Sequence, residues 1–413
     1  MNRRCSDFLL YWDSMFELMP SGTVTSVRGF LAGAVHAGIK SKNELDLAIL
    51  YSKVPCTATG VFTTNRIKSA PVILSQKHLS NRQAQAIVVN SGCANACLGE
   101  QGLADALETA RLTAIKLGIP LENVLVASTG VIGVPLPMNY IRAGIGEIRL
   151  YKDGGHDFAK AIMTTDTKPK EMAVQVDMGG AKFTIAGVAK GAGMIHPNLA
   201  TMLCFIATDA SVDVNFLEVA LQRAVHVSFN MISVDGDTSP SDSVFLLANG
   251  MASNEPIDFD NGEAFQEALN EVCIYLAKSI AQDGEGATKL IEVTIEGALD
   301  EAEARQASRA IASSPSVKTA IHGSDPNWGR IVAALGRSGA EVIEDKLDVY
   351  LNDTCVMKQG HPTPFSTEEM KAALSSSANV LIRLCLNLED GKATAWGCDL
   401  SEEYVRINSE YTT

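Results

Sequence analysis

Hydrophobic residues recur at helical spacing in two long segments of the chain. Between Gly102 and Gly118 the apolar positions fall on one helical face, and Gly118 and Pro120 supply stop signals. These positions are Leu103, Ala106, Leu107, Ala110, Ala114 and Leu117. A second amphipathic helix is predicted from about Asn261 to Gln282. Its apolar stripe consists of Phe265, Leu269, Val272, Cys273, Leu276 and Ile280.

Shorter apolar runs predict strands around these helices. The runs 86–90 and 123–127 are typical of buried strands. The segment 172–189 alternates between polar and apolar residues and turns at Gly179-Gly180, which predicts a hairpin. The next strand is expected at 201–208.

The last third of the chain has a different pattern, in which short strands alternate with short helices. Strands are predicted at 291–295 and 347–351, and Ser366-Thr-Glu-Glu369 forms a capping box at a helix start. Residues 379–387 are expected to pair with 393–398 across the turn Glu389-Asp-Gly391. Hairpins mixed with helices favour an α+β layered fold over a doubly wound parallel sheet.

Composition narrows the class of protein. The chain has 413 residues, 46% of them hydrophobic and 20% charged, enough for a sizeable core in one large domain or in two or three. A formal charge of -14 argues against a nucleic-acid binder. No apolar run is long enough to span a bilayer, so no membrane partner is expected. Acidic residues interrupt the first twenty positions, which we interpret as an extension and not a signal peptide.

Cysteine and histidine usage gives no sign of a metal site. The nine cysteines are scattered, which fits reduced thiols in a cytoplasm. The seven histidines form no metal-binding motif. The acidic loop Ser233-Val-Asp-Gly-Asp237 lacks the other ligands of a calcium-binding loop. No metal and no resident cofactor are expected.

The run from Lys190 to Thr201 offers the strongest candidate chemistry. A threonine whose own peptide bond has been cut gains a free amine that can act as its base. His196, five positions earlier, could be a general base, but such an amine needs no imidazole, so a structural role is preferred. From spacing alone, however, a glycine-rich loop that enters a buried strand is the favoured interpretation.

Three further features are candidates for site chemistry. Ser128-Thr129-Gly130 follows a predicted strand, so it is a turn by itself and an oxyanion site if its N–H groups converge. Lys190 could bind a carboxylate, although a lone lysine is more often solvated. Glu285, between two glycines, would repel a phosphate and suits an amino group better.

Five segments, taken in order, resemble the ornithine acetyltransferase (glutamate N-acetyltransferase) family of arginine biosynthesis. They are Ser128-Thr-Gly-Val-Ile-Gly133, Thr164-Thr-Asp-Thr167, the run Lys190 to Thr201, Asp283-Gly-Glu-Gly-Ala-Thr288 and His322-Gly-Ser-Asp-Pro-Asn-Trp-Gly-Arg330. The resemblance runs from about Gly22 to Thr413. It implies a cytoplasmic enzyme that transfers acetyl from N-acetylornithine to glutamate through an acetyl-Thr201 intermediate.

The resemblance also implies self-cleavage between Ala200 and Thr201, which gives an α chain of 1–200 and a β chain of 201–413. The implied fold is a four-layer α/β/β/α sandwich completed by 201–289, with a smaller α+β domain at about 290–413. The implied assembly has two α and two β chains. The freed amine has a reference pKa of about 7.7 to 8.0, suitable for a base near neutral pH.

Site residues follow from the same resemblance. Thr129 and Gly130 form the oxyanion hole beside the nucleophile Thr201. Substrate contacts fall on one of Thr164 and Thr165, on Lys190, Thr201, Glu285 and Asn408, and on Thr413. Acetyl-CoA remains open as a second acetyl donor. The alternatives are a self-processing aminopeptidase or amidase with the same threonine, or an uncleaved small-molecule binding protein.

Overall fold

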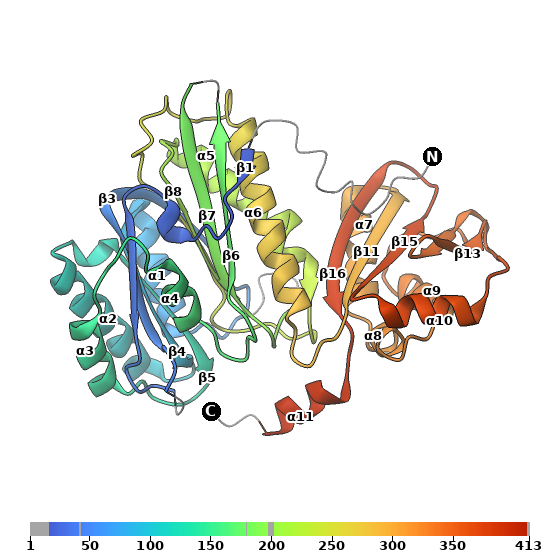
Figure 1. Cartoon of the computed structure of the whole chain (residues 1–413), viewed down its shortest axis with the longest axis horizontal. Helices are drawn as coiled ribbons and strands as arrows, with labels where there is room; N and C mark the ends of the chain where they lie inside the picture. The colour runs from blue at the N-terminus through green and yellow to red at the C-terminus, as the bar shows by residue number, and fades with distance from the viewer. Residues whose placement is uncertain (1–15, 41–42, 179, 197–201, 411–413) are drawn as a thin grey trace.

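The computed structural model describes residues 16–40, 43–178, 180–196 and 202–410. Two mixed β-sheets, each covered by helices, make up the described chain (Figure 1). Of the amino-terminal extension expected at 1–20, residues 1–15 lie outside the described segments, whereas Phe16–Leu18 form strand β1, which pairs with β6 (Lys170–Asp177). No helix in the described segments has both the length and the apolarity needed to cross a lipid bilayer.

The first sheet has nine strands among the described residues, in the order β1-β6-β7-β8-β10-β3-β4-β5, with β2 paired to β3. Their bounds are β1 Phe16–Leu18, β2 Phe30–Val35, β3 Leu47–Phe62, β4 Gln83–Cys93, β5 Val124–Val131, β6 Lys170–Asp177, β7 Lys182–Lys190, β8 Leu203–Thr208 and β10 Ser243–Ala248. Strands β8 and β10 are parallel, as are β4 and β5, and the other pairs are antiparallel.

Alternation of side chains along the strands divides this sheet into two β layers. In β4, Ile87 and Val89 point into an inner cluster that also contains Phe205 of β8 and Phe245 of β10. Val88 faces the opposite way, toward helices. Because successive residues of a strand face opposite sides, each half of the sheet has one face on the inner cluster and one under helices. The result is the four-layer α/β/β/α sandwich expected from the sequence, with the two β layers joined where β10 pairs with β3.

Helices cover both outer faces of the sandwich (Figure 1). The helices associated with this sheet are α1 Ala70–His78, α2 Gly99–Leu117, α3 Met138–Glu147, α4 Gly155–Ala161, α5 Val214–Val227 and α6 Glu263–Gln282. Helices α1, α2 and α3 pack on β3–β5, and α5 and α6 pack on the layer that contains β6–β8. Helix α4 instead closes the inner cluster, where the rings of Phe158 and Phe205 meet edge to face at 5.6 Å.

The second sheet has seven strands in the described residues, in the order β14-β13-β12-β15-β11-β16-β9. Their bounds are β9 Ile232–Ser233, β11 Leu290–Ala298, β12 Asp348–Leu351, β13 Thr354–Lys358, β14 His361–Pro362, β15 Asn379–Cys385 and β16 Gly391–Cys398. Its helices are α7 Glu301–Ala312, α8 Pro315–His322, α9 Trp328–Gly336 and α10 Thr367–Ser376, and α11 Glu402–Glu410 follows β16 as a separate helix. Short 3-10 helices lie at Val24–Ser26, Leu79–Asn81, Leu121–Asn123, Phe229–Met231 and Glu344–Lys346.

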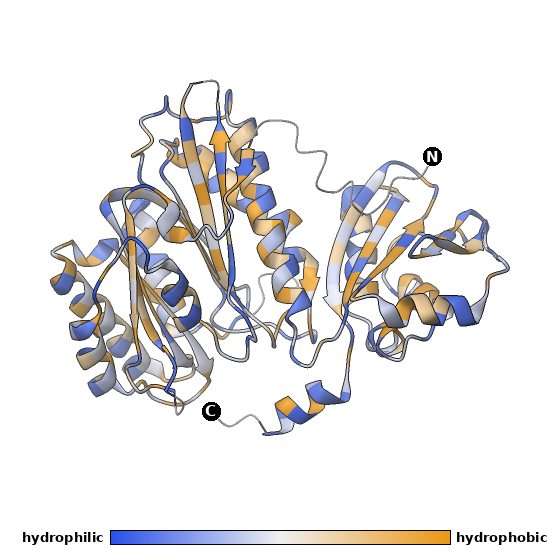
Figure 2. Ribbon diagram, in the orientation of Figure 1, coloured by the Kyte–Doolittle hydropathy of each residue, from blue (hydrophilic) through white to orange (hydrophobic). Residues whose placement is uncertain are grey.

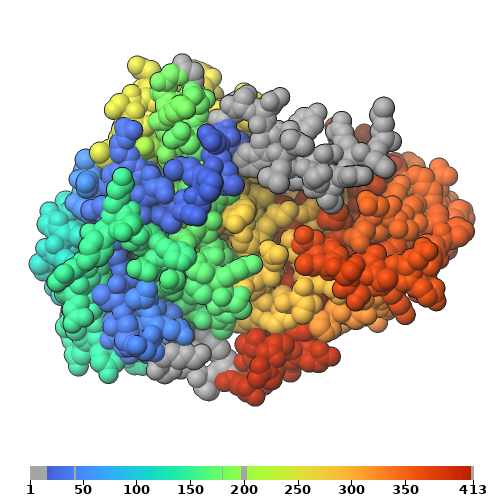
Figure 3. Space-filling model, in the orientation of Figure 1, coloured from blue at the N-terminus to red at the C-terminus, as the bar shows by residue number. Residues whose placement is uncertain are grey.

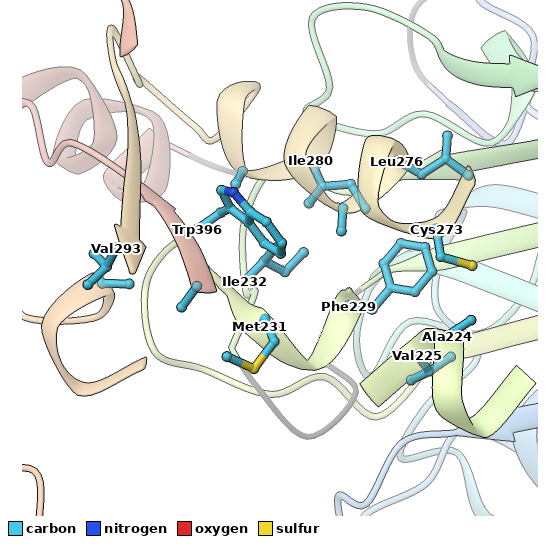
Figure 4. Packing of buried hydrophobic residues seen from close by; sticks show 14 of the residues in the cluster. Ala224, Val225, Phe229, Met231, Ile232, Cys273, Leu276, Ile280, Val293 and Trp396 are labelled. Carbon is cyan, nitrogen blue, oxygen red and sulfur yellow. The ribbon is translucent and has the colours of Figure 1, made fainter. Parts of the chain in front are cut away.

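The hydrophobic core is continuous from the sandwich into the second sheet. Figure 4 shows Trp396 of β16 beside Ile232, with Ile280 of α6 and Phe229 following toward the sandwich. Figure 2 shows hydrophobic residues concentrated on the strands and on the helix faces that meet them. The division of the chain near residue 290 stays a prediction. Strand β9 belongs to the second sheet although it precedes this point in the sequence.

Most elements expected from periodicity are confirmed. The hairpin of 172–189 is β6 paired with β7, and the helix expected from 261 to 282 is α6. The run 86–90 lies in β4, and 124–127 lie in β5, while Asn123 ends the 3-10 helix before it. Ser366 caps α10, since its hydroxyl accepts the backbone N–H of Glu369.

Two expectations are wrong. Strands β15 and β16 do not pair across 389–391, because β11 lies between them, parallel to β15 and antiparallel to β16. The helix expected at 102–118 is α2, and Ala106, Ala110 and Ala114 of its predicted apolar face are buried. Contrary to the expectation, Leu103 is exposed, and the buried face also includes Asp105, Thr109 and Thr113. The two threonine hydroxyls donate to carbonyls one turn back, at 2.8 and 2.9 Å, so both are buried with their hydrogen bonds satisfied.

Candidate active site

Strand β5 ends in the segment that the sequence left open between a turn and an oxyanion site. Ser128, Thr129 and Gly130 continue the strand, each opposite a residue of β4, so the turn interpretation is wrong. Among the described strands only β4 pairs with β5, so the other edge of β5 keeps backbone groups that no strand binds.

The backbone at Gly130 requires a glycine. Its φ is +127°, and a Cβ there would lie 2.3 Å from the carbonyl carbon of Gly92 on β4. Any other residue would have to push the two strands apart. The local geometry beside Thr129 therefore depends on this position.

Lys190 lies at the end of β7 and is buried, with 3% of its surface exposed. Its Nζ donates to Oγ1 of Thr164 at 2.7 Å and to Oγ1 of Thr129 at 3.3 Å. Burial lowers the pKa of this ammonium group, and the nearby carboxylate of Asp166 opposes that shift. Lys190 is thus a buried cation beside the expected oxyanion residues and not the solvated charge that is usual for a lone lysine.

The structure distinguishes the two neighbouring threonines. Thr164 contacts Lys190 through its hydroxyl, and its backbone N–H donates to Asp166. Both Thr164 and Thr165 are half-buried. Thr164 is therefore the one that this network brings to Lys190.

A carboxylate lies at the other end of the candidate site. Glu285 follows α6 and is 9% exposed, and Nδ2 of Asn408 on α11 donates to its Oε2 at 2.7 Å. A Cβ at Gly193 would lie 2.4 Å from the Glu285 carboxyl group, so that glycine lets the carboxylate approach the glycine-rich run. Two of the expected substrate-binding residues, far apart in sequence, are thereby in direct contact.

Aspartates hold the chain on both sides of the expected cleavage point. Asp235 accepts the backbone N–H groups of Met194 and Ile195 at 2.5 and 2.9 Å. Asp242 accepts the N–H of Met202 at 2.9 Å. Ala200, Thr201 and Thr413 themselves lie outside the described residues.

Asp242 is fully buried, and burial raises its pKa well above the usual range for an aspartate, although Met202 and Lys190 counteract part of this shift. Asp235 has a pKa raised by the same cause. His196 instead contacts Ser233, with 3.1 Å between Nδ1 and Oγ, and burial lowers its pKa.

Sequence reasoning gave no role to Asp166, Lys170, Asp235 or Asp242. Asp166 and Asp235 belonged to segments singled out for other reasons, but nothing in a single sequence indicates which carboxylate becomes buried. In the described chain, no three His, Cys, Asp or Glu side chains are arranged to hold a metal ion. The eight cysteines within the same residues are all free thiols.

Comparison with known proteins places these residues in context. A model of the ArgJ family matches residues 31–413. A relative from Dehalococcoides mccartyi, named arginine biosynthesis bifunctional protein ArgJ, is 56% identical over 97% of this chain and 100% of its own length. A protein of the same name from Symbiobacterium thermophilum is 51% identical over 95% of this chain and 99% of its own.

A solved structure from Bacillus halodurans, also an arginine biosynthesis bifunctional protein, is 45% identical, with a TM-score of 0.49. It covers 50% of this chain and 98% of its own length.

Proposed function

The chain belongs to the ArgJ family, and on that premise we propose that it transfers an acetyl group from N-acetylornithine to glutamate after cutting itself before Thr201. As a member of this family the chain is an acyltransferase of arginine biosynthesis. The substrates, the self-cleavage and the site residues are the content of the proposal.

Self-cleavage needs no partner other than water. The Thr201 hydroxyl attacks the carbonyl carbon of Ala200, and the nitrogen of Thr201 leaves as a free amine while an ester forms at Oγ. Water then hydrolyses the ester, which releases the carboxylate of Ala200. Thr201 is left with a hydroxyl and an amine that can take its proton.

Acetyl transfer follows in two half-reactions at the same hydroxyl. Thr201 attacks the acetyl carbon of N-acetylornithine, ornithine leaves with the proton, and an acetyl ester remains on Thr201. The amine of glutamate attacks that ester and gives N-acetylglutamate. Each step passes through a tetrahedral oxyanion, which the backbone at Thr129 and Gly130 would stabilise by roughly 2.7 to 4 kcal/mol for each donor.

The buried ammonium of Lys190 is the observation that carries this proposal. It lies within hydrogen-bond distance of Thr129 and Thr164, so a substrate carboxylate bound there would have its α-carbon near the expected oxyanion hole. Glu285, held by Asn408, supplies the opposite charge and suits the side-chain ammonium group of N-acetylornithine, because the α-nitrogen of this substrate is an uncharged amide. A cation and an anion in one small site fit the two charged groups of N-acetylornithine, its α-carboxylate and its side-chain ammonium.

The first test is the protein's own processing. A denaturing gel of the wild-type protein should show two fragments of similar size, and Thr201→Ala should give one full-length band. Thr201→Ser, which keeps the hydroxyl, is the matched control and should still cleave. An uncut wild-type chain would refute the proposal.

The second test separates transfer from hydrolysis. Ornithine release from N-acetylornithine should require glutamate and should produce an equal amount of N-acetylglutamate. Release at the same rate in water alone would instead support the aminopeptidase or amidase alternative.

We also propose a second acetyl donor, since the relatives from Dehalococcoides mccartyi and Symbiobacterium thermophilum are both named as bifunctional. Glutamate acetylation with acetyl-CoA and without N-acetylornithine should proceed, and its absence would restrict the enzyme to acetyl recycling.

The proposed setting is the cytoplasm, and the proposed assembly has two α and two β chains. Its native mass should be twice the 43.9 kDa of the chain.

A further inference from the structure

Four buried charges form a row behind the candidate site. Asp166 Oδ2 lies 3.9 Å from Nζ of Lys190, and Asp166 Oδ1 accepts a hydrogen bond from Nζ of Lys170 at 2.6 Å. Lys170 also donates to Oδ2 of Asp283 at 2.6 Å. The Lys170 side chain is fully buried, and Asp166 and Asp283 are also buried. The row contains two cations and two anions, so its formal charge is zero.

Asp166 binds both segments that supply the Lys190 end of the site. It accepts the backbone N–H of Gly191 at 2.7 Å, directly after Lys190, and that of Thr164 at 3.1 Å. Burial raises the pKa of this carboxyl group, but the two lysines and these hydrogen bonds outweigh it and hold the pKa at about 2. Asp166 is therefore a permanent anion near Lys190.

Asp283 likewise binds backbone groups at the other end of the row. It accepts the backbone N–H of Thr167 at 3.0 Å and also the Thr167 hydroxyl. It precedes Glu285 by two residues, and the backbone N–H of Glu285 donates to the carbonyl of Ala192 at 2.8 Å. The segment that carries Glu285 is thus attached both to the 164–167 loop and to the glycine-rich run.

We propose that Asp166 and Lys170 are positioning residues for the acetyl transfer, because they join the carboxylate-binding end of the site at Lys190 to the amine-binding end at Glu285. Neither residue touches the substrate. The inference rests on the proposed function, and it adds that the spacing between the two ends is set by one buried ammonium group. Lys170 also joins residues on both sides of the proposed cleavage point.

The charges around Lys190 make the two positioning residues act in opposite directions. The groups that influence Lys190 or are influenced by it are Asp166, Lys170, Asp242, Glu285 and Lys40. Asp166 raises the pKa of Lys190, and Lys170 lowers it. Removing the Asp166 carboxylate should lower the pH at which Lys190 loses its proton, whereas removing Lys170 should not lower it.

The experiment compares Asp166→Asn and Lys170→Met in the processed enzyme, with KM for N-acetylornithine measured from pH 6.5 to 9. For Asp166→Asn we expect KM to exceed the wild-type value by about tenfold at pH 9 and by less at pH 6.5. For Lys170→Met we expect KM to be about tenfold higher than the wild-type value at every pH. The pH at which KM rises because Lys190 loses its proton should stay the same or increase. Lys170→Arg should recover part of the loss, because it keeps the charge.

Asp348→Asn is the matched control. Asp348 also accepts hydrogen bonds from a lysine and from a backbone N–H, Lys358 at 2.6 Å and Gln359 at 2.9 Å, but in the second sheet. It should leave KM and its pH dependence unchanged. If Asp166→Asn and Lys170→Met raised KM equally and independently of pH, their role would be purely structural and the inference would be overturned.

Thr167→Val decides the question if the buried variants fail to fold. Thr167 is exposed, so this change removes one hydrogen bond to Asp283 without leaving a buried charge unpaired. KM should rise several-fold while self-cleavage continues, and an unchanged KM would overturn the inference. If the wild type itself neither cleaves nor transfers, the proposed function fails. Normal transfer in every variant refutes only the positioning role.

Discussion

The burial and the charge of individual side chains in the site cannot be inferred from their neighbours in the sequence. Lys190 is almost completely buried, and its counter-charge comes from a carboxylate 24 residues earlier in the chain. Asp242 is buried with a raised pKa, directly against the residue that follows Thr201. Such groups are stable only because each is hydrogen-bonded, and exchange of any one should have a measurable effect.

Gly130→Ala should weaken both the fold and self-cleavage. The positive φ costs about 1 to 3 kcal/mol for a residue with a side chain, and the added Cβ would also clash with Gly92. Gly133→Ala is the control, because its φ is +81° and a Cβ there meets no atom within 4 Å. Urea unfolding should show the larger loss for Gly130→Ala, and only this variant should accumulate uncut chain. If the two alanine variants lost equal stability and cleaved equally well, the close contact with Gly92 would be excluded as the cause.

Asp242→Asn should stabilise the uncleaved Thr201→Ala protein, and more so at pH 8 than at pH 5. A carboxyl group whose pKa is raised on folding stabilises the folded state at low pH and loses that contribution as the pH rises. Asparagine keeps an oxygen for the Met202 N–H and has no charge to bury. Melting temperatures of the single and double variants at both pH values would measure this, and a difference independent of pH would contradict it.

At the scale of elements, helix α11 is a separate arm that brings Asn408 to Glu285. None of its described side chains is buried, so the helix depends on a few polar contacts. The Tyr404 hydroxyl donates to Oδ2 of Asp235 at 3.3 Å, and the Ser401 hydroxyl donates to the carbonyl of Gly286 at 2.6 Å. Figure 3 shows this segment, in red, along the lower edge of the molecule. An element with so few buried contacts should open more easily than the sandwich.

Tyr404→Phe should therefore raise KM for N-acetylornithine by about two- to tenfold, the effect of one lost hydrogen bond, and leave self-cleavage intact. Val405→Ala on the same helix is the control, since Val405 is 64% exposed. Steady-state kinetics and a denaturing gel give both readouts. A normal KM in Tyr404→Phe would show that the bond to Asp235 does not hold α11 in place.

At the scale of the whole molecule, the proposed cleavage would not divide the fold into two bodies. Strand β7, before the cleavage point, pairs with β8 after it, and β3 pairs with β10. Both fragments also contribute to the inner hydrophobic cluster. The two chains would share one sheet and one core.

The fragments should consequently remain together through gel filtration in 1 M salt, roughly the range in which surface charges are screened. They should also unfold in a single transition. Separation of the α and β chains under native conditions would contradict the shared sheet, while Thr201→Ala provides the uncut reference for the elution volume.

Local sequence predicted what depends on local periodicity. The hairpin β6–β7 and helix α6 follow from alternation and from a continuous apolar stripe, because neighbouring residues alone determine which face they present. The five family-like segments contain Lys190 and Glu285, and the resemblance that they carry also named Asn408; the structure brings these residues into one region. Thr201 could be singled out in the same way, but its geometry lies outside the described residues.

The tertiary structure alone decided the rest. Strand β11 is inserted between β15 and β16 because pairing of distant strands depends on which faces become buried together, for which there is no local signal. The row from Lys190 to Asp283 has the same origin, since Lys170 and Asp283 are 113 positions apart. The sequence determined which residues could take part in the chemistry. Folding determined which carboxylates became buried and paired with Lys170 and Lys190.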